Sequence, residues 1–308
     1  MKIIKKIIHS FKLNKENVPD MKTRKTIMTL AILLAAYVLL PYHAPAISAD
    51  KISFAVIFLG GPDTGEEGEK IITQFVNSLS KLSGMSKNSI QGKYFNNIAD
   101  AKTYIQQNKN SYVMASLGFY LANRKGMNLL PLALVKIQGN DKEQYYLIVK
   151  KGKYESLKEL KGKILAGNII YEDKKFINKL VFNNKVDIST YFKLKPSNRP
   201  RSAIRKLTSG EYDAVLLNHM QYNNLKRLPE FSGIQIIHES AQMPALGFMM
   251  VNTSKNKSSQ KKIINAITRM CNQDDTREAC KNFGIDGFDK IEPEILDNEI
   301  KKYEKGDK

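Results

Sequence analysis

A regular alternation between two patterns constrains the fold of this chain more than any other feature, and it begins near residue 51. Short segments such as the apolar run 52–59, and 90–95, predict strands. Between them lie segments whose apolar residues recur at helical spacing, such as 66–83 and 98–107, and these predict helices. Strands that alternate with helices are typical of a largely parallel sheet wrapped by helices. We therefore expect an α/β fold.

The rest of the chain follows the same alternation, without internal repeats or low-complexity segments. With 308 residues, of which 42% are hydrophobic, it is long enough for two compact units with separate cores. Further strands are predicted at 112–116, 129–137, 145–149, 163–166, 191–194, 214–217, 234–238 and 245–251, and further helices at 119–125, 156–160, 174–182, 202–209, 219–226, 257–270, 276–283 and 293–303.

The first 49 residues have the pattern of an export leader. Met21-Lys-Thr-Arg-Lys25 is basic, 27–40 is apolar, and Ala44-Pro-Ala46 or Ile47-Ser-Ala49 supplies a small-residue cleavage site. The apolar run is shorter than the roughly 20 residues that span a membrane, and an uncleaved anchor is the alternative. Because residues 1–20 make the leader unusually long, Met21 is an alternative start. We expect a periplasmic mature protein.

The chain has two cysteines, Cys271 and Cys280, in a polar segment between two predicted helices. In an oxidising compartment we expect them to form a disulfide that joins these helices, with free thiols as the alternative. After the leader only His219 and His238 remain, and neither stands in ligand spacing with another histidine or a cysteine. We therefore predict no metal site and no cofactor.

The composition is strongly basic, with 49 Lys and Arg against 30 Asp and Glu and a formal net charge of +19. Such a charge is compatible with nucleic acid, an anionic membrane surface or an anionic solute as partner. The lysines are scattered over amphipathic helices and no recognition motif accompanies them. We therefore predict a solvated basic surface and no nucleic-acid partner.

Four segments of the chain are distinctive in composition and order: Ser111-Tyr-Val-Met-Ala-Ser-Leu-Gly-Phe-Tyr120, 145–163 with Ser156-Leu-Lys-Glu-Leu-Lys-Gly-Lys163, Thr208-Ser-Gly-Glu-Tyr-Asp-Ala-Val-Leu-Leu-Asn218, and Ile237-His-Glu-Ser-Ala-Gln-Met-Pro244. Their order resembles the phosphate/phosphite/phosphonate-binding branch of the type 2 periplasmic solute-binding proteins of ABC transporters. This resemblance covers about residues 52–251 and implies a two-lobed α/β fold, each lobe a mostly parallel sheet wrapped by helices.

The resemblance also implies a division of the chain. Residues 1–49 are the leader, 50–144 and 242–308 form lobe 1, and 145–241 form lobe 2. The chain then crosses between the lobes near Tyr145 and again near Ala245. Two such crossings form a hinge that leaves each sheet intact.

One segment departs from the family. Members that bind phosphonates usually follow the strand predicted at 163–166 with a Ser-Thr-Ser-Gly turn, whose hydroxyl and N–H groups cradle the anion. This chain has Gly167-Asn-Ile-Ile-Tyr-Glu-Asp-Lys-Lys175 there, with two isoleucines and an acidic pair. The histidine that family members carry before the third segment is also absent, and Arg199-Pro-Arg201 occupies its region.

The binding site is predicted from strand ends. In α/β sheets ligands bind beyond the carboxyl ends of the strands, and in two-lobed proteins they bind between the lobes. Each candidate also has an ordinary structural role as its alternative, in a turn, a helix cap, the core or the solvated surface. The candidates are Gly61, Asp63, Thr64, Ser116, Leu117, Asn168, Asn218, His219 and Tyr222, with Arg199 and Arg201 as further anion ligands.

We predict a monomeric receptor that binds a small solute, a phosphonate- or phosphate-like anion, and delivers it to the membrane permease of an ABC importer. The alternative keeps the fold but gives it an apolar or lipidic ligand, as a carrier or as the ligand-binding subunit of a membrane sensor. Apolar residues that border the predicted cleft favour this alternative: Leu117, Phe119, Ile169, Ile170 and 243–250. No catalytic Ser-His-Asp or Cys-His arrangement can be assembled, so we predict that the protein is not an enzyme.

Overall fold

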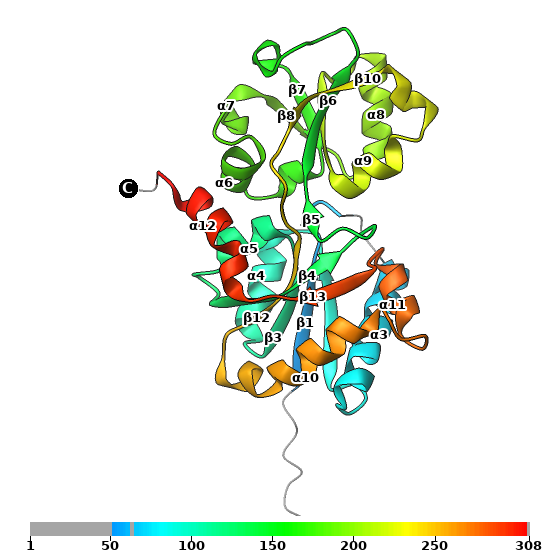
Figure 1. Cartoon of the computed structure of the whole chain (residues 1–308), viewed down its shortest axis with the longest axis vertical. Helices are drawn as coiled ribbons and strands as arrows, with labels where there is room; N and C mark the ends of the chain where they lie inside the picture. The colour runs from blue at the N-terminus through cyan, green and yellow to red at the C-terminus, as the bar shows by residue number, and fades with distance from the viewer. Residues whose placement is uncertain (1–50, 62–64, 307–308) are drawn as a thin grey trace, which may run out of the picture. The chain divides into compact units, whose positions relative to one another are not determined.

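The computed structural model describes residues 51–61 and 65–306. The predicted leader, the alternative start at Met21, and Asp63 and Thr64 of the predicted site lie outside the described residues. Residues 50–308 form one compact unit. Its two large sheets lie one above the other along the vertical axis of Figure 1. We call the part built around the lower sheet lobe 1 and the part built around the upper sheet lobe 2.

Lobe 1 contains a six-stranded sheet with the order β13-β4-β12-β3-β1-β2. Every residue of β1 and β12 is buried, as expected for strands that helices cover on both faces. Phe54 of β1 packs against Phe75 and Phe248, which forms the aromatic centre of this core. The strands are β1 (Ile52–Ile57), β2 (Ile90–Phe95), β3 (Ser111–Met114), β4 (Leu129–Lys136), β12 (Leu246–Val251) and β13 (Gly287–Lys290).

Lobe 2 contains a five-stranded sheet with the order β10-β6-β9-β7-β8. Its central strands β6 and β9 are apolar and almost completely buried, whereas the edge strand β8 is largely exposed. The strands are β6 (Tyr145–Lys150), β7 (Ile164–Gly167), β8 (Lys193–Pro196), β9 (Ala214–Asn218) and β10 (Ile234–Glu239).

Both sheets are mixed, which corrects the expectation that their strands run mostly parallel. In lobe 1, β1 is parallel to β2 and β3, but β12 is antiparallel to β3 and β4. In lobe 2, β7 is parallel to β8 and β9, but β6 is antiparallel to β9 and β10. The chain enters β6 and β12 on passing from one lobe to the other, so these strands run against their neighbours. The α/β fold with two lobes is confirmed.

A short two-stranded sheet joins the lobes. It consists of β5 (Lys142–Glu143) and β11 (Met243–Pro244), which pair antiparallel, and β5 lies between the two large sheets in Figure 1. Both strands lie next to the predicted crossings at Tyr145 and Ala245. Strands of this length are too short to show the periodicity from which strands are predicted.

Helices cover both sheets, and most lie where the sequence predicts them. The segment predicted as one helix at 174–182 begins as a single α-helical turn and continues as a π-helix. The helices are α3 (Gly65–Ser83), α4 (Ile98–Gln107), α5 (Leu117–Asn123), α6 (Lys174–Phe176), α7 (Ile188–Tyr191), α8 (Pro200–Ser209), α9 (His219–Leu225), α10 (Ser254–Met270), α11 (Arg277–Asn282) and α12 (Asp297–Glu304), with the π-helix η3 (Ile177–Val181) and the 3-10 turns η1 (Leu157–Leu160), η2 (Ile169–Tyr171), η4 (Pro229–Gly233) and η5 (Pro293–Leu296).

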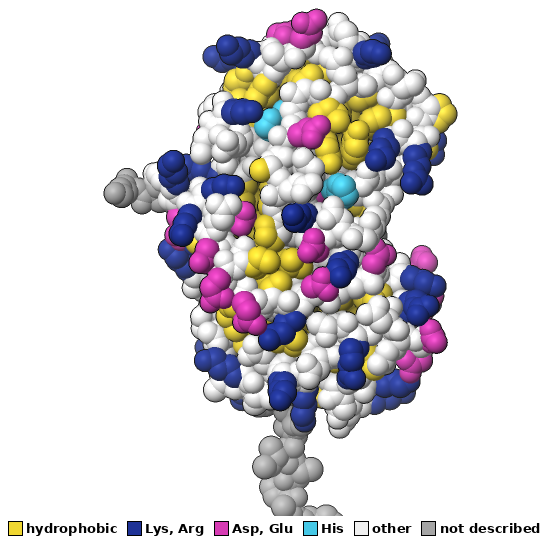
Figure 2. Space-filling model, viewed as in Figure 1, with side chains coloured by type: hydrophobic (Ala, Val, Ile, Leu, Met, Phe, Trp, Pro, Cys, Tyr) yellow, Lys and Arg dark blue, Asp and Glu magenta, His cyan; other side chains and the backbone are white. Residues whose placement is uncertain are grey.

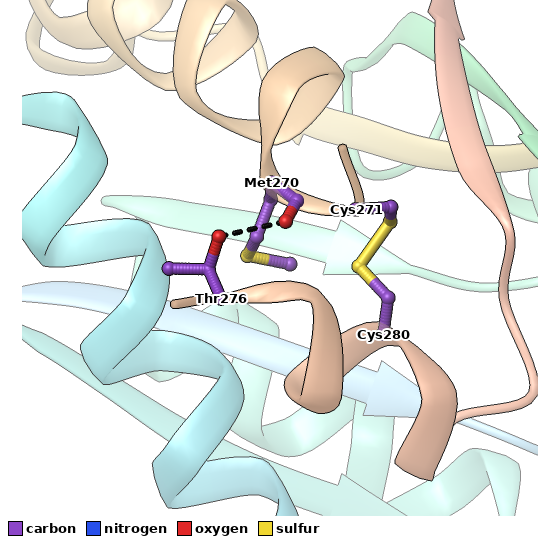
Figure 3. Close-up of a disulfide and its surroundings, with 4 residues drawn as sticks. All are labelled: Met270, Cys271, Thr276 and Cys280. Carbon is purple, nitrogen blue, oxygen red and sulfur yellow. Dashed lines mark hydrogen bonds between the residues drawn. A yellow bond between two sulfur atoms is a disulfide. The ribbon is translucent and has the colours of Figure 1, made fainter. Parts of the chain in front are cut away.

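The predicted disulfide is present. Cys271 at the end of α10 is bonded to Cys280 in α11, and both residues are buried (Figure 3). The turn between the two helices is also held by the Thr276 hydroxyl, which donates to the carbonyl oxygen of Met270 at 2.7 Å. Covalent and hydrogen-bonded links therefore fix the angle at which α11 leaves α10.

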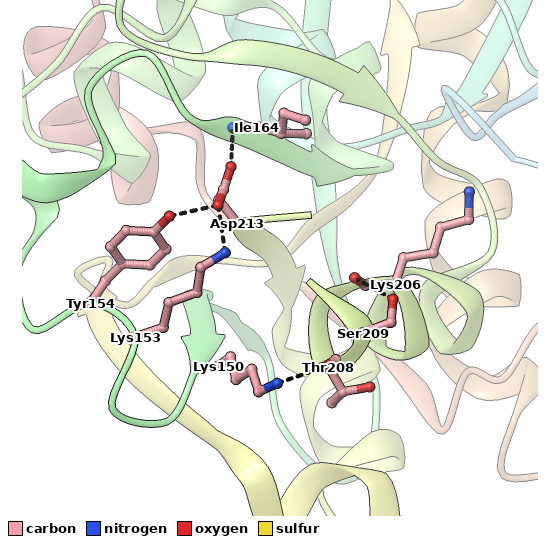
Figure 4. A network of polar contacts seen from close by, with 8 residues as sticks. All are labelled: Lys150, Lys153, Tyr154, Ile164, Lys206, Thr208, Ser209 and Asp213. Atoms are coloured by element: carbon pink, nitrogen blue, oxygen red, sulfur yellow. Dashed lines mark hydrogen bonds and ion pairs between the residues drawn. The ribbon is translucent and has the colours of Figure 1, made fainter. Parts of the chain in front are cut away.

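Asp213, the aspartate of the third family-like segment, fastens the start of β7 to β9 (Figure 4). Its Oδ2 accepts a hydrogen bond from the backbone N–H of Ile164 at 3.0 Å. Its Oδ1 accepts from Nζ of Lys153 at 2.8 Å and from the hydroxyl of Tyr154 at 2.6 Å. Burial alone would raise the pKa of Asp213, but these hydrogen bonds hold it below its usual value. The motif aspartate therefore has a structural role in this chain.

On the face of the molecule shown in Figure 2, Lys and Arg side chains are dispersed over both lobes and acidic side chains lie among them. Several basic side chains form surface ion pairs, such as Lys136 with Asp289 and Lys206 with Glu211. Exposed pairs of this kind contribute little to stability, typically about 0–1 kcal/mol. The high net charge is thus not concentrated in one basic patch on this face.

Candidate functional site

A pocket of about 280 Å³ lies where strand ends from both large sheets meet the two-stranded hinge. Lobe 1 contributes the residues that follow β1 and β3, and lobe 2 contributes the residues at the ends of β7 and β9. The hinge contributes Glu143, Met243 and Pro244. This is the position at which ligands are expected in a two-lobed α/β protein.

The wall of the pocket is mainly apolar. Among the described residues that line it, the carboxyl groups are those of Glu143 and Glu172, and there is no lysine, arginine or histidine. The apolar residues of the wall are Val56, Ile57, Phe58, Leu59, Met114, Ala115, Leu117, Val135, Ile137, Ile169, Met220, Met243, Pro244, Ala245, Leu246, Phe283 and Ile285.

Glu143 lies on the hinge strand β5 and is held by backbone donors from both sides. Its Oε1 accepts from the N–H of His219 at 3.1 Å and from the N–H of Gln144 at 3.0 Å. Burial raises the pKa of Glu143 to about 7, although these two hydrogen bonds counteract part of the rise. The carboxyl group is therefore partly protonated near neutral pH.

Glu172 lies directly after η2 and extends to the first turn of α5 in lobe 1. A side chain at Gly118 would place its Cβ 2.7 Å from Oε2 of Glu172, so the carboxyl group rests against the backbone of that turn. Burial raises the pKa of Glu172 to about 7, and the Ser116 hydroxyl offsets only part of the effect. The negative charges of Asp173 and Glu143 add to the rise. Oε2 is buried and has no hydrogen-bond partner among the described residues.

Glu172 and its neighbour Asp173, which the sequence presents as an acidic pair, have different roles. Asp173 is the N-cap of α6 and accepts from the N–H of Phe176 at 2.8 Å. It also accepts from the hydroxyl of Tyr303 in the C-terminal helix at 2.9 Å. Only Glu172 of the pair lines the pocket.

Two amide side chains of lobe 2 line the pocket and are oriented by one buried glutamine. Nε2 of Gln221 donates to Oδ1 of Asn168 at 3.0 Å, and the backbone N–H of Gln221 donates to Oδ1 of Asn218 at 2.9 Å. Gln221 also accepts from the N–H of Asn218, which completes a capping box at the start of α9. Gln221 therefore fixes the orientation of both amide groups.

Gly167 explains how Asn168 reaches the pocket. Its φ of +147° is unfavourable for other residues, and a Cβ at this position would lie 2.5 Å from the carbonyl oxygen of Leu216 on β9. Only glycine lets β7 approach β9 this closely and turn at its end. The turn predicted at Gly167 and Asn168 is therefore present, but it delivers apolar and acidic side chains rather than hydroxyl groups.

Four of the predicted site residues line this pocket: Ser116, Leu117, Asn168 and Asn218. Ser116 is also the N-cap of α5, because its Oγ accepts from the N–H of Phe119 at 3.0 Å. Gly61 does not line the pocket but follows Phe58 and Leu59, which do. Asp63 and Thr64 lie outside the described residues.

The predicted residues His219 and Tyr222 do not line the pocket. The His219 ring is hydrogen-bonded to Asn223 at 2.8 Å, and burial lowers the pKa of His219. Tyr222 stacks on Tyr146 with ring centroids 4.3 Å apart. His219 contributes its backbone N–H, which orients Glu143, rather than its imidazole.

Arg199 and Arg201 lie at the start of α8 and do not line the pocket. The side chain of Arg201 is 57% exposed and pairs with Glu230 at 3.3 Å. Arg199 is the exposed N-cap residue of α8. The structure therefore places both arginines on the surface of lobe 2.

Sequence reasoning missed Glu143 and did not assign Glu172 to the site. Glu143 belongs to a two-residue strand and carries no motif, so only the fold reveals its position. The apolar residues predicted to border the cleft are also divided by the structure: Leu117, Ile169 and Met243 line the pocket, whereas Phe119 and Ile170 are buried in the core.

A contact between the lobes lies beside the pocket. The ring of Tyr171 in lobe 2 rests against Gly60 in lobe 1, where a side chain at residue 60 would overlap it. Gly60 has a φ of +68°, so glycine is required for the backbone as well as for the contact. A second link is the hydrogen bond from Nε2 of Gln138 to Oδ1 of Asn224, at 2.7 Å.

Within residues 51–61 and 65–306, no group of three or more His, Cys, Asp or Glu side chains is arranged to bind a metal ion. No helix in this part of the chain is long and apolar enough to cross a membrane.

Comparison with known proteins gives a family match over most of the chain. Residues 63–296 match the family described as ABC transporter, phosphonate, periplasmic substrate-binding protein. No curated protein matches.

Several solved structures have a similar fold. XAC2383 from Xanthomonas citri, bound to ATP, is 14% identical with a TM-score of 0.66, over 83% of this chain and 97% of that chain. A binding protein component of an ABC phosphonate transporter from Pseudomonas aeruginosa is 12% identical with a TM-score of 0.60, over 82% and 84%. PhnD1 from Prochlorococcus marinus, in complex with methylphosphonate, is 17% identical with a TM-score of 0.58, over 82% and 98%. At these identities the likeness concerns the fold alone.

Proposed function

Because the chain belongs to the family of periplasmic substrate-binding proteins of ABC phosphonate transporters, we propose that it binds one small solute between its lobes and delivers it to a membrane permease. The family is one of binding proteins and not of enzymes. In this proposal the protein acts as a monomer in the periplasm, after its leader has been removed. A role as the ligand-binding subunit of a membrane sensor is the alternative.

The observation that carries this proposal is the position of the pocket. It is lined from both lobes and from the hinge strands β5 and β11. A ligand at this position contacts both lobes at once, so its binding energy favours the conformation in which they are close together. The proposed division into 50–144 with 242–308 and 145–241 places the hinge at the two crossings.

Two ligand classes follow from different observations. A small phosphonate follows from the family, and methylphosphonate is the ligand of the relative from Prochlorococcus marinus. An apolar ligand follows from the pocket wall, which is mainly hydrocarbon and lacks the hydroxyl turn. The volume of about 280 Å³ favours a small molecule over a whole lipid, because pockets for drug-sized ligands measure roughly 300–1,000 Å³.

The first test combines calorimetry with small-angle scattering. Phosphate, methylphosphonate and a lipid extract are titrated into the mature protein, and scattering is recorded with each ligand that binds. We expect a more compact particle with bound ligand, because opening must break contacts such as Gln138 with Asn224. An unchanged particle with a ligand of measured affinity would contradict closure of the lobes.

Two substitutions test whether the ligand binds in this pocket. Ile169→Asp places an additional charge in the apolar wall and is expected to abolish binding of an apolar ligand. Arg199→Ala is the matched control on the surface of lobe 2, and it should leave binding unchanged. If Arg199→Ala weakened binding by about tenfold or more, the loss of a charged hydrogen bond, the site would lie elsewhere.

A further inference from the structure

The C-terminal helix α12 is joined to both lobes, although the chain enters it from lobe 1. It follows β13 of the lobe 1 sheet, and between the two the N–H of Ile291 donates to the carbonyl oxygen of Leu132 on β4 at 3.2 Å. In Figure 1 the helix lies beside α5 of lobe 1 and below α6 of lobe 2. A helix in this position can hold the two lobes together.

The contacts of α12 with lobe 1 are mainly ion pairs. Glu304 pairs with Arg124 and, at 2.7 Å, with Lys125, and both basic residues lie at the end of α5. The side chain of Arg124 is only 11% exposed, so solvent and salt screen this pair less than a surface pair. Leu296, in the turn before α12, is completely buried. These contacts anchor the helix on lobe 1.

The contacts of α12 with lobe 2 involve the segment 173–179. The hydroxyl of Tyr303 donates to Oδ1 of Asp173 at 2.9 Å, and Nζ of Lys175 lies 4.5 Å from the centre of the Tyr303 ring. Nζ of Lys179 in η3 donates to the carbonyl oxygen of Lys305 at 2.6 Å. We call these three interactions the α12 contact.

The α12 contact adjoins the pocket segment of lobe 2 and is incompletely packed. Asp173, which caps α6, comes directly after Glu172 of the pocket lining. A cavity of about 240 Å³ lies beside the contact, lined by Glu299 and Lys302 of α12, by η3 and by the second crossing at 239–243. An interface made of polar contacts around a cavity is one that two parts of a protein can form and break as they move.

We propose that α12 holds the lobes in the conformation in which both of them line the pocket, and that it does so through Tyr303 and Lys179. The inference rests on the proposed function, since it concerns the closing of the same site. Neither residue lines the pocket, so both are positioning residues that act through the relative placement of the lobes.

This role affects how tightly a solute binds. The contacts of Tyr171 with Gly60 and of Gln138 with Asn224 also link the lobes, and the α12 contact adds to them. The protein itself then supplies part of the free energy of closure, and the solute has to supply correspondingly less. The apparent affinity for any solute decreases in proportion when the closed fraction of the protein decreases.

The test measures the separation of the lobes in the mature protein without a ligand. Because the two cysteines of the chain form the disulfide, Ser258→Cys in α10 and Ser209→Cys in α8 provide one exposed labelling site on each lobe. Electron–electron resonance between spin labels at these sites gives the distribution of distances. Tyr303→Phe with Lys179→Met removes both hydrogen bonds of the α12 contact. We expect it to raise the population of a second distance about tenfold or more, the effect of losing a charged hydrogen bond.

Three further variants make the result specific. Tyr303→Phe alone keeps the ring beside Lys175 and should give a smaller change in the same direction. Tyr191→Phe removes a hydroxyl hydrogen bond of 3.0 Å to the carbonyl oxygen of Leu157 within lobe 2, so it should lower the melting temperature and leave the distances unchanged. Lys301→Met, an exposed position on α12, should change neither quantity. Thermal melting establishes that each variant is folded.

An unchanged distance distribution in the folded double variant would overturn the inference, and so would an equal change in Tyr191→Phe. If the double variant does not fold, an unchanged distribution in Tyr303→Phe has the same consequence. The measurement involves no ligand, so none of these results bears on the proposed function, which the titrations with phosphate, methylphosphonate and a lipid extract test separately.

Discussion

Asp213 shows how a motif residue acquires its meaning from its contacts. In the sequence it belongs to a segment that resembles a binding-protein family, and such a residue is readily taken for a ligand contact. In the structure it accepts three hydrogen bonds, from Ile164, Lys153 and Tyr154, and its side chain is only 16% exposed. It joins β7 to β9 and to the turn after β6, far along the strands from the ends that form the pocket.

We predict that Asp213→Ala lowers the free energy of unfolding by about 2–3 kcal/mol, because the three donors lose their common acceptor. Urea denaturation of the mature protein measures this change. The matched control is Asp289→Ala, which removes an exposed partner of Lys136 and should cost about 0–1 kcal/mol. Equal effects of the two substitutions would show that the Asp213 network does not stabilise lobe 2.

At the scale of elements, sequence patterns predicted the positions of helices better than the type of helix that forms. The segment 174–182 has helical spacing, but the chain adopts one α-helical turn followed by the π-helix η3. Asn183 and Asn184 with positive φ then end it. The neighbour of η3 is α12, which joins it through the bond from Nζ of Lys179 to the carbonyl oxygen of Lys305 at 2.6 Å. Contacts with such a distant segment are not visible in local periodicity.

The second prediction concerns the disulfide that joins α10 to α11. The disulfide closes a loop with a sequence separation of 9, and constraint of such a loop in the unfolded chain is worth roughly 2–3 kcal/mol. We expect the double substitution Cys271→Ser and Cys280→Ser to lower the free energy of unfolding by about this amount. Denaturation with and without a reductant tests it, since a reductant should destabilise the native protein but not the double variant. An equal response of both proteins would contradict a stabilising disulfide.

At the scale of the whole molecule, the site is an assembly of segments that are distant in sequence. The pocket brings together the ends of β1, β3, β7 and β9 with the hinge strands. Two carboxyl groups from different segments, Glu143 and Glu172, both line it, and burial raises the pKa of each to about 7. The site therefore makes the stability of the protein depend on pH.

We predict that Glu143 and Glu172 destabilise the ligand-free protein as pH rises. Their pKa in the folded protein is raised from 4.5 to about 7, so the folded chain binds more protons than the unfolded chain between these values. The free energy of unfolding should consequently fall across this window and level off above it. Melting temperatures measured from about pH 5 to about pH 8 test the prediction.

The informative quantity is the difference between the native protein and the double variant Glu143→Gln with Glu172→Gln. Burial lowers the pKa of His219 and His238, so these histidines add stability as pH rises and act in the opposite direction. The double variant keeps both histidines and loses the two carboxyl groups. If its pH profile matched that of the native protein, ionisation of the two glutamates would not affect folding.

The sequence by itself determined the α/β class, the two lobes, most helices and strands, and the disulfide pair. The two lobes were implied by the resemblance of four segments to a known family. The other features follow from local periodicity, glycine and cap residues, and a small set of cysteines, all of which act over short stretches of chain. It also located the turn at Gly167 and Asn168 and several strand ends that line the pocket.

Only the tertiary structure decided strand direction, the role of Asp213, the surface position of Arg199 and Arg201, and the acidic character of the pocket. Each of these depends on which distant segments are brought together. Glu143 and Glu172 are separated by more than one strand and have no shared motif, yet burial at the same site changes their protonation. Desolvation and packing depend on the assembled fold, so they cannot be predicted from a local pattern in the chain.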